Sequence, residues 1–596
     1  MNKKYIKWLG GTLMGTAIVA GLSSCSDDHF NVNPDVAGRS SLWQNIESNE
    51  ELSEFADILK RVRYSKSEGS VTPQTYADLL DHDQTFTVWA PKNGTFDYQY
   101  YDKLLKDGTV GSEYTVEKEL IRNNLTRYSY VMSGADSLNI ELFNSKTAMF
   151  NCAKATIKNS RIVQPNIGAS NGVLHIVDEP ISYQPNLYEY MATMPELDSL
   201  NTFVKKYEIM DFNENASTQG PTVDGQITWV DSVMYVNNEY LSQINAYINS
   251  EDSCYAMIMP TNEAWKQALA MSEKYFKFRD SYTQTVVTEN PDGTTSTVSK
   301  NTSFTPEQLD SLTELYTKNA ITQNLVFNAN YQYGYSYKDF AVPGACDSLT
   351  STVQEDYISS NTAFYAPECS ELFDGAEPVT LSNGYAYIVN NFNFKPNLSW
   401  AYDKEISALS RNVETYSKCS LAPSSVDYQY TVTDENGEVV LDTLASYILV
   451  KTIQQSSSSN PEVTFKIPNT LSCKYDIYVL MAYNTEANKP TKFRAQLSYH
   501  TESKATVTTT TLSVPAGGHG SGTSFENVAP HLDENGNFQI IDSVLLAKDF
   551  EFPVAYMGLN DAYVTLKLVC YVGSRETTQY TREMWIDKII FKAKDE

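Results

Sequence analysis

The sequence predicts an α+β protein in which two copies of one domain precede an all-β sandwich. Phe86–Phe96 reads FTVWAPKNGTF and returns, altered, as YAMIMPTNEAW at Tyr255–Trp265. A second phrase, SNGVLHIVD from Ser170, returns in the same order as SNGYAYIVN from Ser382. From about Ala401 onward the chain shows long alternating strands separated by turn residues. Two phrases repeated in one order indicate a tandem repeat, and many alternating strands are typical of a sandwich.

Each repeated phrase predicts a strand. In the first phrase Phe86, Val88 and Ala90 alternate with more polar neighbours, which predicts a strand with one face packed inward, and a proline ends it. The second phrase opens on Asn171-Gly172 in one copy and Asn383-Gly384 in the other, and this dipeptide predicts a tight turn before a strand.

Helices and domain boundaries follow from periodicity. Apolar residues in Leu52–Leu59 and in Leu197–Val204 recur at helical spacing, so we expect each repeat to open on an amphipathic helix. We place the first repeat at 42–186, the second at 187–400 and the sandwich at 401–596. Both repeats should be small β-sandwiches with helices packed along them.

The repeated phrases resemble the motifs of the fasciclin-like domain family. Ala90–Asn93 and Met259–Asn262 match its alanine-proline-threonine-asparagine motif, and an asparagine-glycine turn followed by a strand matches its second motif. The sequence departs at Arg122–Leu125, where the family usually has a histidine. The resemblance implies two fasciclin-like domains, each a β-sandwich or wedge with packed helices, in a family that is mostly adhesive or ligand-binding.

The last part of the chain predicts a jelly-roll-like sandwich. Tyr563–Gly573 places apolar side chains on one face of a strand and polar ones on the other. Trp585–Phe591 resembles the last strand of jelly-roll domains appended to bacterial carbohydrate-active proteins, and a generic closing strand is the alternative.

Two insertions lengthen the second repeat. The segment 282–303 carries Pro291-Asp292-Gly293 between runs rich in Thr and Val, which predicts a hairpin. The segment 331–369 is rich in tyrosine, serine and aspartate. Its alternating tyrosines are candidate ligand contacts on one strand face, or a cross-strand stack that covers the core. These tyrosines are Tyr331, Tyr333, Tyr335 and Tyr337.

The N-terminus predicts export and a lipid anchor. Three lysines precede the apolar run Trp8–Leu22, and small residues lead to Cys25, which is the pattern of a secretory signal peptide over residues 1–24. Leu22–Cys25 resembles a bacterial lipobox, which implies lipid attachment at Cys25; a secreted protein with a chance cysteine is the alternative. Residues 25–41 read as a flexible tether. Its start resembles the surface-export signal of Bacteroides-group lipoproteins, or is simply a solvated linker. The three residues concerned are Ser26, Asp27 and Asp28.

Charge and cysteine content narrow the classes of partner. The formal net charge of −28 argues against nucleic acid, which needs clustered Lys and Arg, and acidity alone suffices to keep a surface protein soluble. Cysteines after Cys25 are odd in number and form no CxxC, so they support no zinc or redox site. Cys346 with Cys369 is the pair to test for a disulfide. The seven are Cys152, Cys254, Cys346, Cys369, Cys419, Cys473 and Cys570.

The sequence offers no catalytic, metal or cofactor constellation. It contains no HExxH, GxSxG or P-loop motif, and its histidines are scattered. His175 lies in a strand where the second copy has Tyr387, which favours packing. Asp533–Asn537 has oxygen-bearing side chains as a calcium loop does, but it lacks the required glycine and distant glutamate, so a hairpin is favoured.

A short triplet of Asp, then Ser or Thr, then an apolar residue recurs along the chain. It resembles the O-glycosylation acceptor of Bacteroides-group exported proteins, although some copies must be chance and Asp198-Ser199 could instead cap a helix. The candidate acceptors are Ser137, Ser199, Ser232, Ser311, Ser348, Thr443 and Ser543.

Together these features predict a non-catalytic outer-membrane lipoprotein that faces the extracellular medium. We expect it to bind a glycan or peptide ligand, or a partner, as an accessory to a starch-utilisation-type, TonB-dependent transporter and its surface lipoprotein. The alternative is an adhesin that attaches the cell to host matrix, glycans or other cells.

Overall fold

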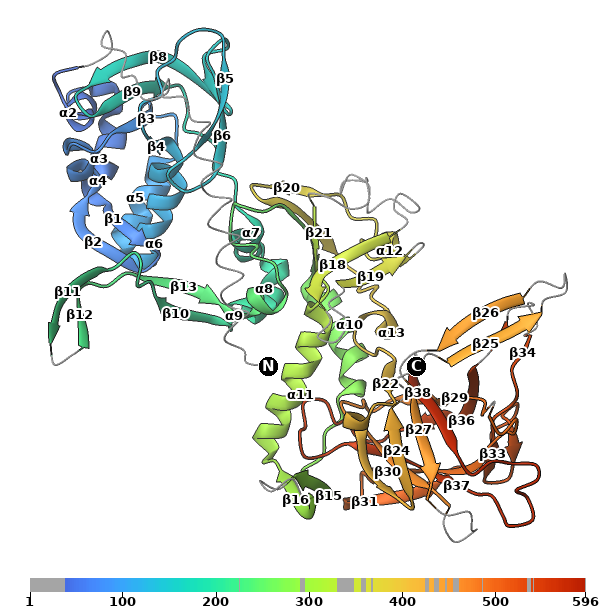
Figure 1. Ribbon diagram of the computed structural model, residues 1–596. Helices are drawn as coiled ribbons and strands as arrows, with labels where there is room; N and C mark the ends of the chain where they lie inside the picture. The colour runs from blue at the N-terminus through green and yellow to red at the C-terminus, as the bar shows by residue number, and fades with distance from the viewer. Residues whose placement is uncertain are drawn as a thin grey trace.

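The structure is a computed structural model in which three domains follow one another along the chain (Figure 1). It describes residues 38–223, 226–289, 295–329, 348–354, 361–365, 368–423, 428–433, 439–444, 447–453, 460–484, 486–532, 538–539 and 541–594.

The two repeated phrases are neighbours in space within each copy. In the first domain β3 (Phe86–Pro91) pairs in parallel with β9 (Gly172–Val177), with Phe86 opposite Gly172. In the second domain β14 (Tyr255–Pro260) pairs in parallel with β21 (Gly384–Val389), with Tyr255 opposite Gly384. The shared register confirms that both copies have one fold, and that the two phrases form its central strand pair.

The first domain packs helices on one face of a seven-stranded sheet of order β4-β3-β9-β8-β7-β6-β5. Its helices include α3, which buries Phe55, Ile58 and Leu59 as the helical spacing predicted. Besides β3 and β9, the helices and strands of this domain are α2 (Leu42–Glu47), α3 (Ser53–Arg61), β1 (Arg63–Ser67), β2 (Ser70–Thr75), α4 (Tyr76–Asp81), α5 (Tyr98–Asp107), α6 (Val110–Val116), β4 (Leu125–Arg127), β5 (Ser137–Glu141), β6 (Thr147–Asn151), β7 (Thr156–Ile157) and β8 (Ser160–Ala169).

The prediction that β3 buries one face was wrong, because all six of its residues are buried. Phe86, Val88 and Ala90 belong to the core under the helices, whereas Trp89 packs into a second core with Phe150 and other residues of the outer strands. A strand buried on both faces loses the apolar–polar alternation that would identify it.

Gly172 sits where a side chain does not fit. Its φ is +147°, and a Cβ there would lie 1.8 Å from the carbonyl oxygen of Phe86 on the neighbouring parallel strand. Gly384 repeats this, with φ +150° and a Cβ 1.9 Å from the Tyr255 oxygen. The glycine of each second phrase therefore permits the close parallel pairing of the phrases.

We expect Gly172→Ala to lower the free energy of unfolding of the first domain by about 3 kcal/mol or more, because backbone strain and a backbone clash add. Urea unfolding followed by tryptophan fluorescence measures this. Gly111→Ala is the control: no atom lies within 4 Å of its added Cβ, and it sits in α6, where alanine favours the helix. Equal stability of the two variants would contradict the close-approach argument.

The second domain repeats this plan with additions. Its six-stranded sheet has the order β19-β18-β17-β14-β21-β20, and α8 buries Leu200, Phe203 and Val204 as predicted. The elements are α7 (Leu187–Thr193), α8 (Asp198–Lys205), α9 (Glu239–Gln243), α10 (Asn262–Ser272), α11 (Pro306–Thr322), β17 (Val326–Asn328), β18 (Ser348–Gln354), β19 (Asn361–Tyr365), α12 (Glu368–Glu371), β20 (Val379–Leu381) and α13 (Pro396–Ser399).

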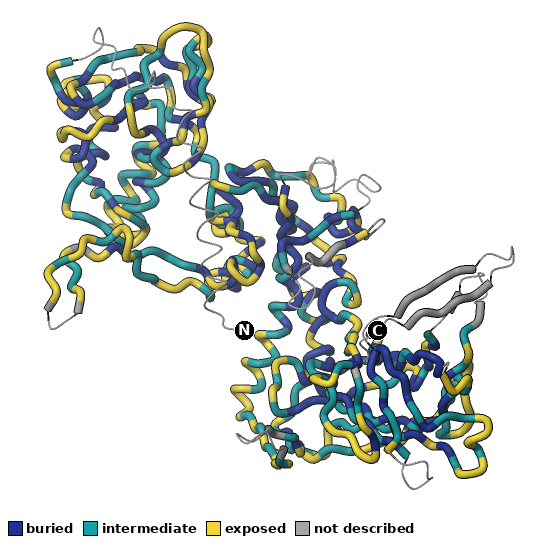
Figure 2. Tube along the Cα trace, in the orientation of Figure 1, coloured by how far each residue is buried: buried dark blue, intermediate teal, exposed yellow. Residues whose placement is uncertain are grey.

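The third domain is the predicted sandwich. One sheet contains β31-β30-β37-β28-β23 and the other β24-β27-β38-β29-β36, and their facing side chains form the buried centre seen in Figure 2. Residues 564–570 alternate buried and half-buried, which confirms the predicted one-faced strand. The strands are β23 (Val413–Ser417), β24 (Cys419–Pro423), β27 (Ile448–Thr452), β28 (Glu462–Ile467), β29 (Lys474–Ala482), β30 (Lys492–Thr501), β31 (Lys504–Thr511), β36 (Ile541–Glu551), β37 (Val564–Cys570) and β38 (Met584–Ala593).

The predicted hairpin at 282–303 exists, and it is not a free loop, because it extends one sheet of the sandwich with β16 as the edge strand. β15 (Ser281–Glu289) and β16 (Thr295–Ser303) pair along nine positions, and β15 adds in parallel to β31 of the sandwich. The Tyr282 hydroxyl donates to the Ala555 carbonyl at 2.7 Å. The second and third domains consequently share one continuous hydrophobic core.

Candidate functional site

The asparagine of each first phrase ties down the start of the amphipathic helix of its domain, which follows a shorter first helix: α3 follows α2, and α8 follows α7. Asn93 accepts a hydrogen bond from the Glu54 amide at 2.9 Å and donates to the Glu50 carbonyl. Asn262 likewise accepts from the Ser199 amide at 2.8 Å and donates to a carbonyl, that of Pro195. These asparagines hold helix starts, whose amides need acceptors.

The asparagine of each second phrase has an equivalent task. Asn171 accepts from the Leu42 amide at 2.8 Å, and Asn383 accepts from the Leu187 amide at 2.9 Å. Both also donate to backbone carbonyls in their own domain, Asn171 to Leu80 near the end of α4 and Asn383 to Ile248. The asparagines that carry the family resemblance therefore hold helix starts in place.

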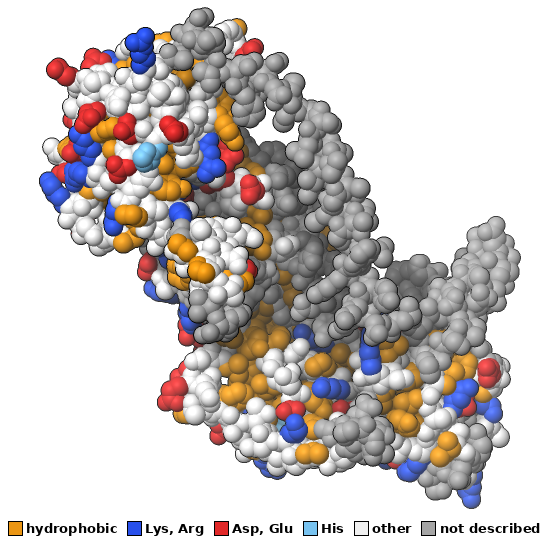
Figure 3. Space-filling model, turned by 60° about the vertical axis from the view of Figure 1, so that its left-hand side comes forward, with side chains coloured by type: hydrophobic (Ala, Val, Ile, Leu, Met, Phe, Trp, Pro, Cys, Tyr) orange, Lys and Arg blue, Asp and Glu red, His pale blue; other side chains and the backbone are white. Residues whose placement is uncertain are grey.

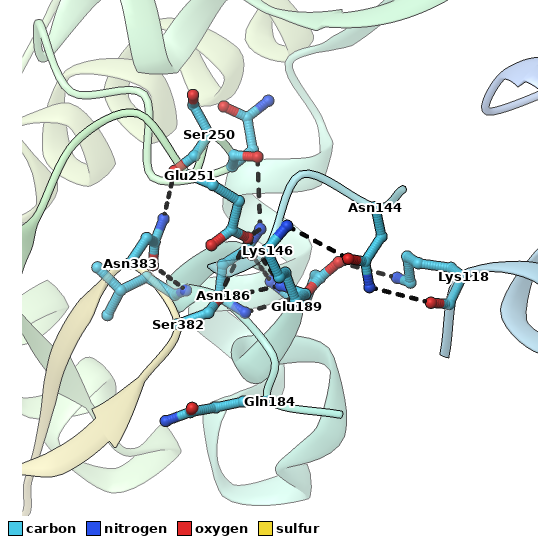
Figure 4. Close-up of polar contacts among 12 residues, drawn as sticks. Lys118, Asn144, Lys146, Gln184, Asn186, Glu189, Ser250, Glu251, Ser382 and Asn383 are labelled. Atoms are coloured by element: carbon cyan, nitrogen blue, oxygen red, sulfur yellow. Dashed lines mark hydrogen bonds and ion pairs between the residues drawn. The ribbon is translucent and has the colours of Figure 1, made fainter. Parts of the chain in front are cut away.

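The junction between the first two domains is a cluster of charged side chains (Figure 4). Lys146 of the first domain, whose side chain is only 5% exposed, contacts Glu251 at 2.7 Å and Glu189 at 3.2 Å in the second domain. It also donates to the Ser382 hydroxyl at 3.0 Å, and Lys118 contacts Glu189 at 3.0 Å. One buried lysine thus joins three segments of the neighbouring domain.

Glu189 is held ionised at this junction. Burial raises the pKa of its carboxyl, but the charges of Lys118 and Lys146 outweigh burial and lower the pKa to about 2. Glu189 also closes the capping box of α7, where it accepts from the Asn186 amide at 2.9 Å. A carboxylate at a helix start is favoured by the helix dipole as well.

A second buried charge pair lies inside the first domain, where the family usually has a histidine. Arg122 contacts Glu117 at 2.7 Å, with side-chain exposures of 13% and 0%. The Tyr76 hydroxyl and the Ser65 amide donate to the same Glu117 oxygen at 2.7 and 2.9 Å. This network ties α6, the hairpin β1–β2 and α4 together and is not open to a ligand.

His175 has the packing role that the sequence predicted. It is fully buried, stacks on Trp89 with ring centroids 5.9 Å apart, and bonds to the Tyr130 carbonyl at 2.9 Å. Burial lowers the pKa of this imidazole to about 4.

Because His175 must stay neutral when folded, we expect acid to destabilise the first domain. The folded pKa lies below the ordinary value of about 6.5, so the unfolded chain binds more protons between these values. Stability contributed by neutral His175 is present above about pH 6.5 and falls by about 3 kcal/mol as the pH drops to about 4. Urea unfolding at both pH values should show this fall in the wild type and a smaller fall in His175→Gln. An equal fall in both proteins would contradict it.

Two surface depressions flank Asn262. One, of about 470 Å³, is lined by Glu196, Thr261, Asn262, Glu263, Ile388 and Asn390. The other, of about 420 Å³, lies along Met191–Pro195 with Asp198 and Asn201. Within the described ranges no group of three or more His, Cys, Asp or Glu side chains is placed to hold a metal ion, and no helix there is long and apolar enough to cross a membrane.

Several predicted site residues lie outside the described residues. These include the lipid-attachment and export residues Cys25, Ser26, Asp27 and Asp28, and the tyrosines Tyr331, Tyr333, Tyr335 and Tyr337. Cys346 and the loop residues Asp533–Asn537 lie outside them too, so the proposed disulfide to buried Cys369 remains a prediction. The hairpin predicted around that loop is confirmed by its flanking strands, because β34 (His531–Leu532) pairs antiparallel with β35 (Phe538–Gln539). Thiols that are free in the structure include Cys152, Cys254, Cys419 and Cys570.

The candidate O-glycosylation residues are scattered over all three domains and form no common site. The suggestion that Asp198-Ser199 caps α8 was wrong, because Leu197 holds the cap position without a side-chain bond and Asn262 satisfies the Ser199 amide. Ser199 and Ser348 are half-buried, and only the strand position of Thr443 is described. The exposed candidates are Ser137, Ser232, Ser311 and Ser543.

One feature of the second domain escaped sequence reasoning altogether. Where the first domain has the short hairpin β1–β2 between α3 and α4, the second has a four-stranded extension between α8 and α9. We call residues 208–238 the arm; it contains β10 (Glu208–Phe212), β11 (Thr218–Val223), β12 (Gln226–Asp231) and β13 (Met234–Asn238). Comparison of the two repeats between their opening helices could have revealed it.

Comparison with known proteins gives one match to a family model and distant likenesses to 19 chains of solved structures. Residues 52–183 match the fasciclin domain, and no curated protein matches the chain. The FAS1 domain pair of the insect cell adhesion molecule fasciclin I is 10% identical and covers 53% of this chain and 90% of its own, with a TM-score of 0.19. The CBM22-1–GH10 modules of Clostridium thermocellum xylanase 10B are 15% identical and cover 29% and 26%, with a TM-score of 0.15. At these TM-scores neither likeness supports an inference about this chain. The family model does: the first of the three domains is a fasciclin domain.

Proposed function

We propose that this protein is a lipid-anchored, non-catalytic binding protein of the cell surface, which serves as an accessory to a TonB-dependent nutrient-uptake transporter. The observation that carries the proposal is the way the domains are joined. A buried lysine fixes the first domain to the second, and a shared core fixes the second to the third. Such joints suit a protein that holds binding surfaces in set positions, and the fasciclin domain belongs to a family associated with binding or adhesion.

The anchor can be tested on its own. We expect Cys25→Ser to abolish incorporation of a clickable fatty acid, because lipid is added to the cysteine of a lipobox and serine cannot replace its thiol. Metabolic labelling followed by gel fluorescence measures this. Cys152→Ser, which removes a half-buried thiol of the first domain, should keep the label. A labelled Cys25→Ser protein would contradict lipid attachment at that residue.

The transporter association is tested by a gentle detergent pull-down of the C-terminally tagged protein from its own outer membrane. Recovery of a transporter and its surface lipoprotein in about equal amounts would support the accessory function, and the cargo would indicate the ligand class. Recovery of the protein alone would remove that support.

An adhesin is the second candidate, and the fasciclin domain is the observation that favours it. Deletion of the protein should then reduce attachment to host matrix or glycan arrays while uptake stays intact. Loss of uptake with normal attachment favours the accessory function instead.

A further inference from the structure

The arm carries four apolar side chains that remain largely exposed to solvent. Ile209, Met210, Ile227 and Val230 are 43%, 53%, 49% and 73% exposed. The arm comes forward in Figure 3, where hydrophobic side chains show on its surface. Exposed apolar residues gathered on one element mark interaction surfaces more often than single scattered ones do.

The arm has a defined shape. The arm consists of two ribbons, β10–β13 next to the helices and β11–β12 at the tip. Phe212 of β10 and Trp229 of β12 pack edge to face with ring centroids 5.0 Å apart, so the two ribbons are joined. The Ser217 hydroxyl accepts from the Val233 amide at 2.8 Å and donates to the Asn213 carbonyl at 2.7 Å. At the far end of the β10–β13 ribbon, where Met234 lies opposite Phe212, the Ser67 hydroxyl of the first domain donates to the Met234 carbonyl.

A two-stranded ribbon buries little apolar surface between its own strands, so burial stabilises it only slightly. β11 and β12 pair with each other and, among the described strands, with no other, so each leaves an open edge. An isolated two-stranded ribbon is marginally stable in water, and open edges accept partner strands. A partner that covers the arm would bury its side chains and could extend its strands.

Charge decides which partner fits. From Tyr207 to Trp265 the sequence contains nine acidic residues and neither Lys nor Arg, and five of the nine lie on the arm. A second copy of a chain of net charge −28 would be repelled, as would nucleic acid and an anionic membrane. The exposed Ile, Met and Val side chains offer sugars no aromatic face, and the Phe212 and Trp229 rings of the arm pack on each other.

We propose that the arm docks on another protein through an apolar patch ringed by Lys and Arg. This goes beyond the proposed function, because the surface would serve a transporter and a host protein equally.

The test places a photo-crosslinking phenylalanine derivative at Val230 or Ile227 in the full chain, in its own cell envelope. The control position is Leu315 on α11, which is comparably exposed at 41%. We expect one adduct from the arm positions, about tenfold above Leu315, with a protein identified by mass spectrometry. The absence of an adduct, or an adduct between two copies of this chain, would overturn the proposal.

The identified protein is then purified and its affinity for the full chain measured by calorimetry. The double variant Ile227→Asp/Val230→Asp should weaken binding by about tenfold or more, whereas Leu315→Asp should leave it unchanged. Glu214→Lys, and salt raised from about 0.05 to about 0.5 M, should also weaken binding, because screening reduces attraction to a basic patch. Binding that is indifferent to both changes would overturn the proposal; circular dichroism checks that the variants fold.

The two proposals fail separately. If the pull-down returns no transporter but the arm crosslinks a basic protein, the accessory function falls and the arm proposal stands. If a transporter co-purifies but the arm positions give no adduct, the accessory function stands and the arm proposal falls.

Discussion

Arg122→Met should lower the free energy of unfolding of the first domain by about 3–5 kcal/mol. The change removes the partner of Glu117, whose side chain is fully buried, and leaves a carboxylate in the interior. It also removes a cation that packs over the rings of Tyr64 and Phe143. Breaking a buried pair from one side costs more than the pair contributes, because the remaining charge stays desolvated.

Urea unfolding of the single variants and of Glu117→Gln/Arg122→Met measures this effect. The double variant keeps an acceptor for the Ser65 amide and the Tyr76 hydroxyl but buries no charge, so it should lose less than Arg122→Met alone. Lys266→Met is the control, because its pair with Glu263 is 3.9 Å long and more than 70% exposed on both sides. Such surface pairs contribute about 0–1 kcal/mol. If Arg122→Met lowers the free energy of unfolding as little as the control does, the Glu117 carboxylate is not held in the protein interior.

Lys146→Met should loosen the first domain from the second. It leaves Glu189 and Glu251 without the cation that bridges them, at an expected cost of about 2–5 kcal/mol to the junction. We expect the domains to open rather than to unfold, because the hydrophobic clusters of the first domain contain no residue of the second. The contact of Lys118 with Glu189 remains and limits the opening. Small-angle X-ray scattering should show a larger maximum dimension, and calorimetry an earlier, separate transition for the first domain.

Lys154→Met is the matched control, because it removes the same charge from an exposed position of the same domain. Scattering curves that coincide for the two variants would mean that the junction does not depend on Lys146. Acid should mimic Lys146→Met: with its pKa lowered to about 2, Glu189 stabilises the folded junction above its ordinary pKa of about 4.3, and this contribution is lost as the pH falls from there toward about 2.

The sequence by itself determined the features that depend on neighbours along the chain. The doubled phrases, the asparagine-glycine turns and the helical spacing in α3 and α8 were readable because period and turn chemistry are local. The hairpin β15–β16 and the one-faced strand β37 were predicted correctly for the same reason. The family resemblance also came from short motifs, and those motif residues act locally, on helix starts and on the close approach at Gly172.

Only the tertiary structure decided how these pieces meet. Parallel pairing of β3 with β9, burial of Trp89 on the second face, and addition of the inserted hairpin to β31 all join residues far apart in sequence, which no local period specifies. Lys146, just before β6, looks like any surface lysine in the sequence until folding brings Glu189 and Glu251 within reach. The arm could not be predicted for a related reason. Its apolar residues alternate only weakly along the chain, so they form no clear strand pattern. They are notable because they are exposed, and exposure is known only once the chain is folded.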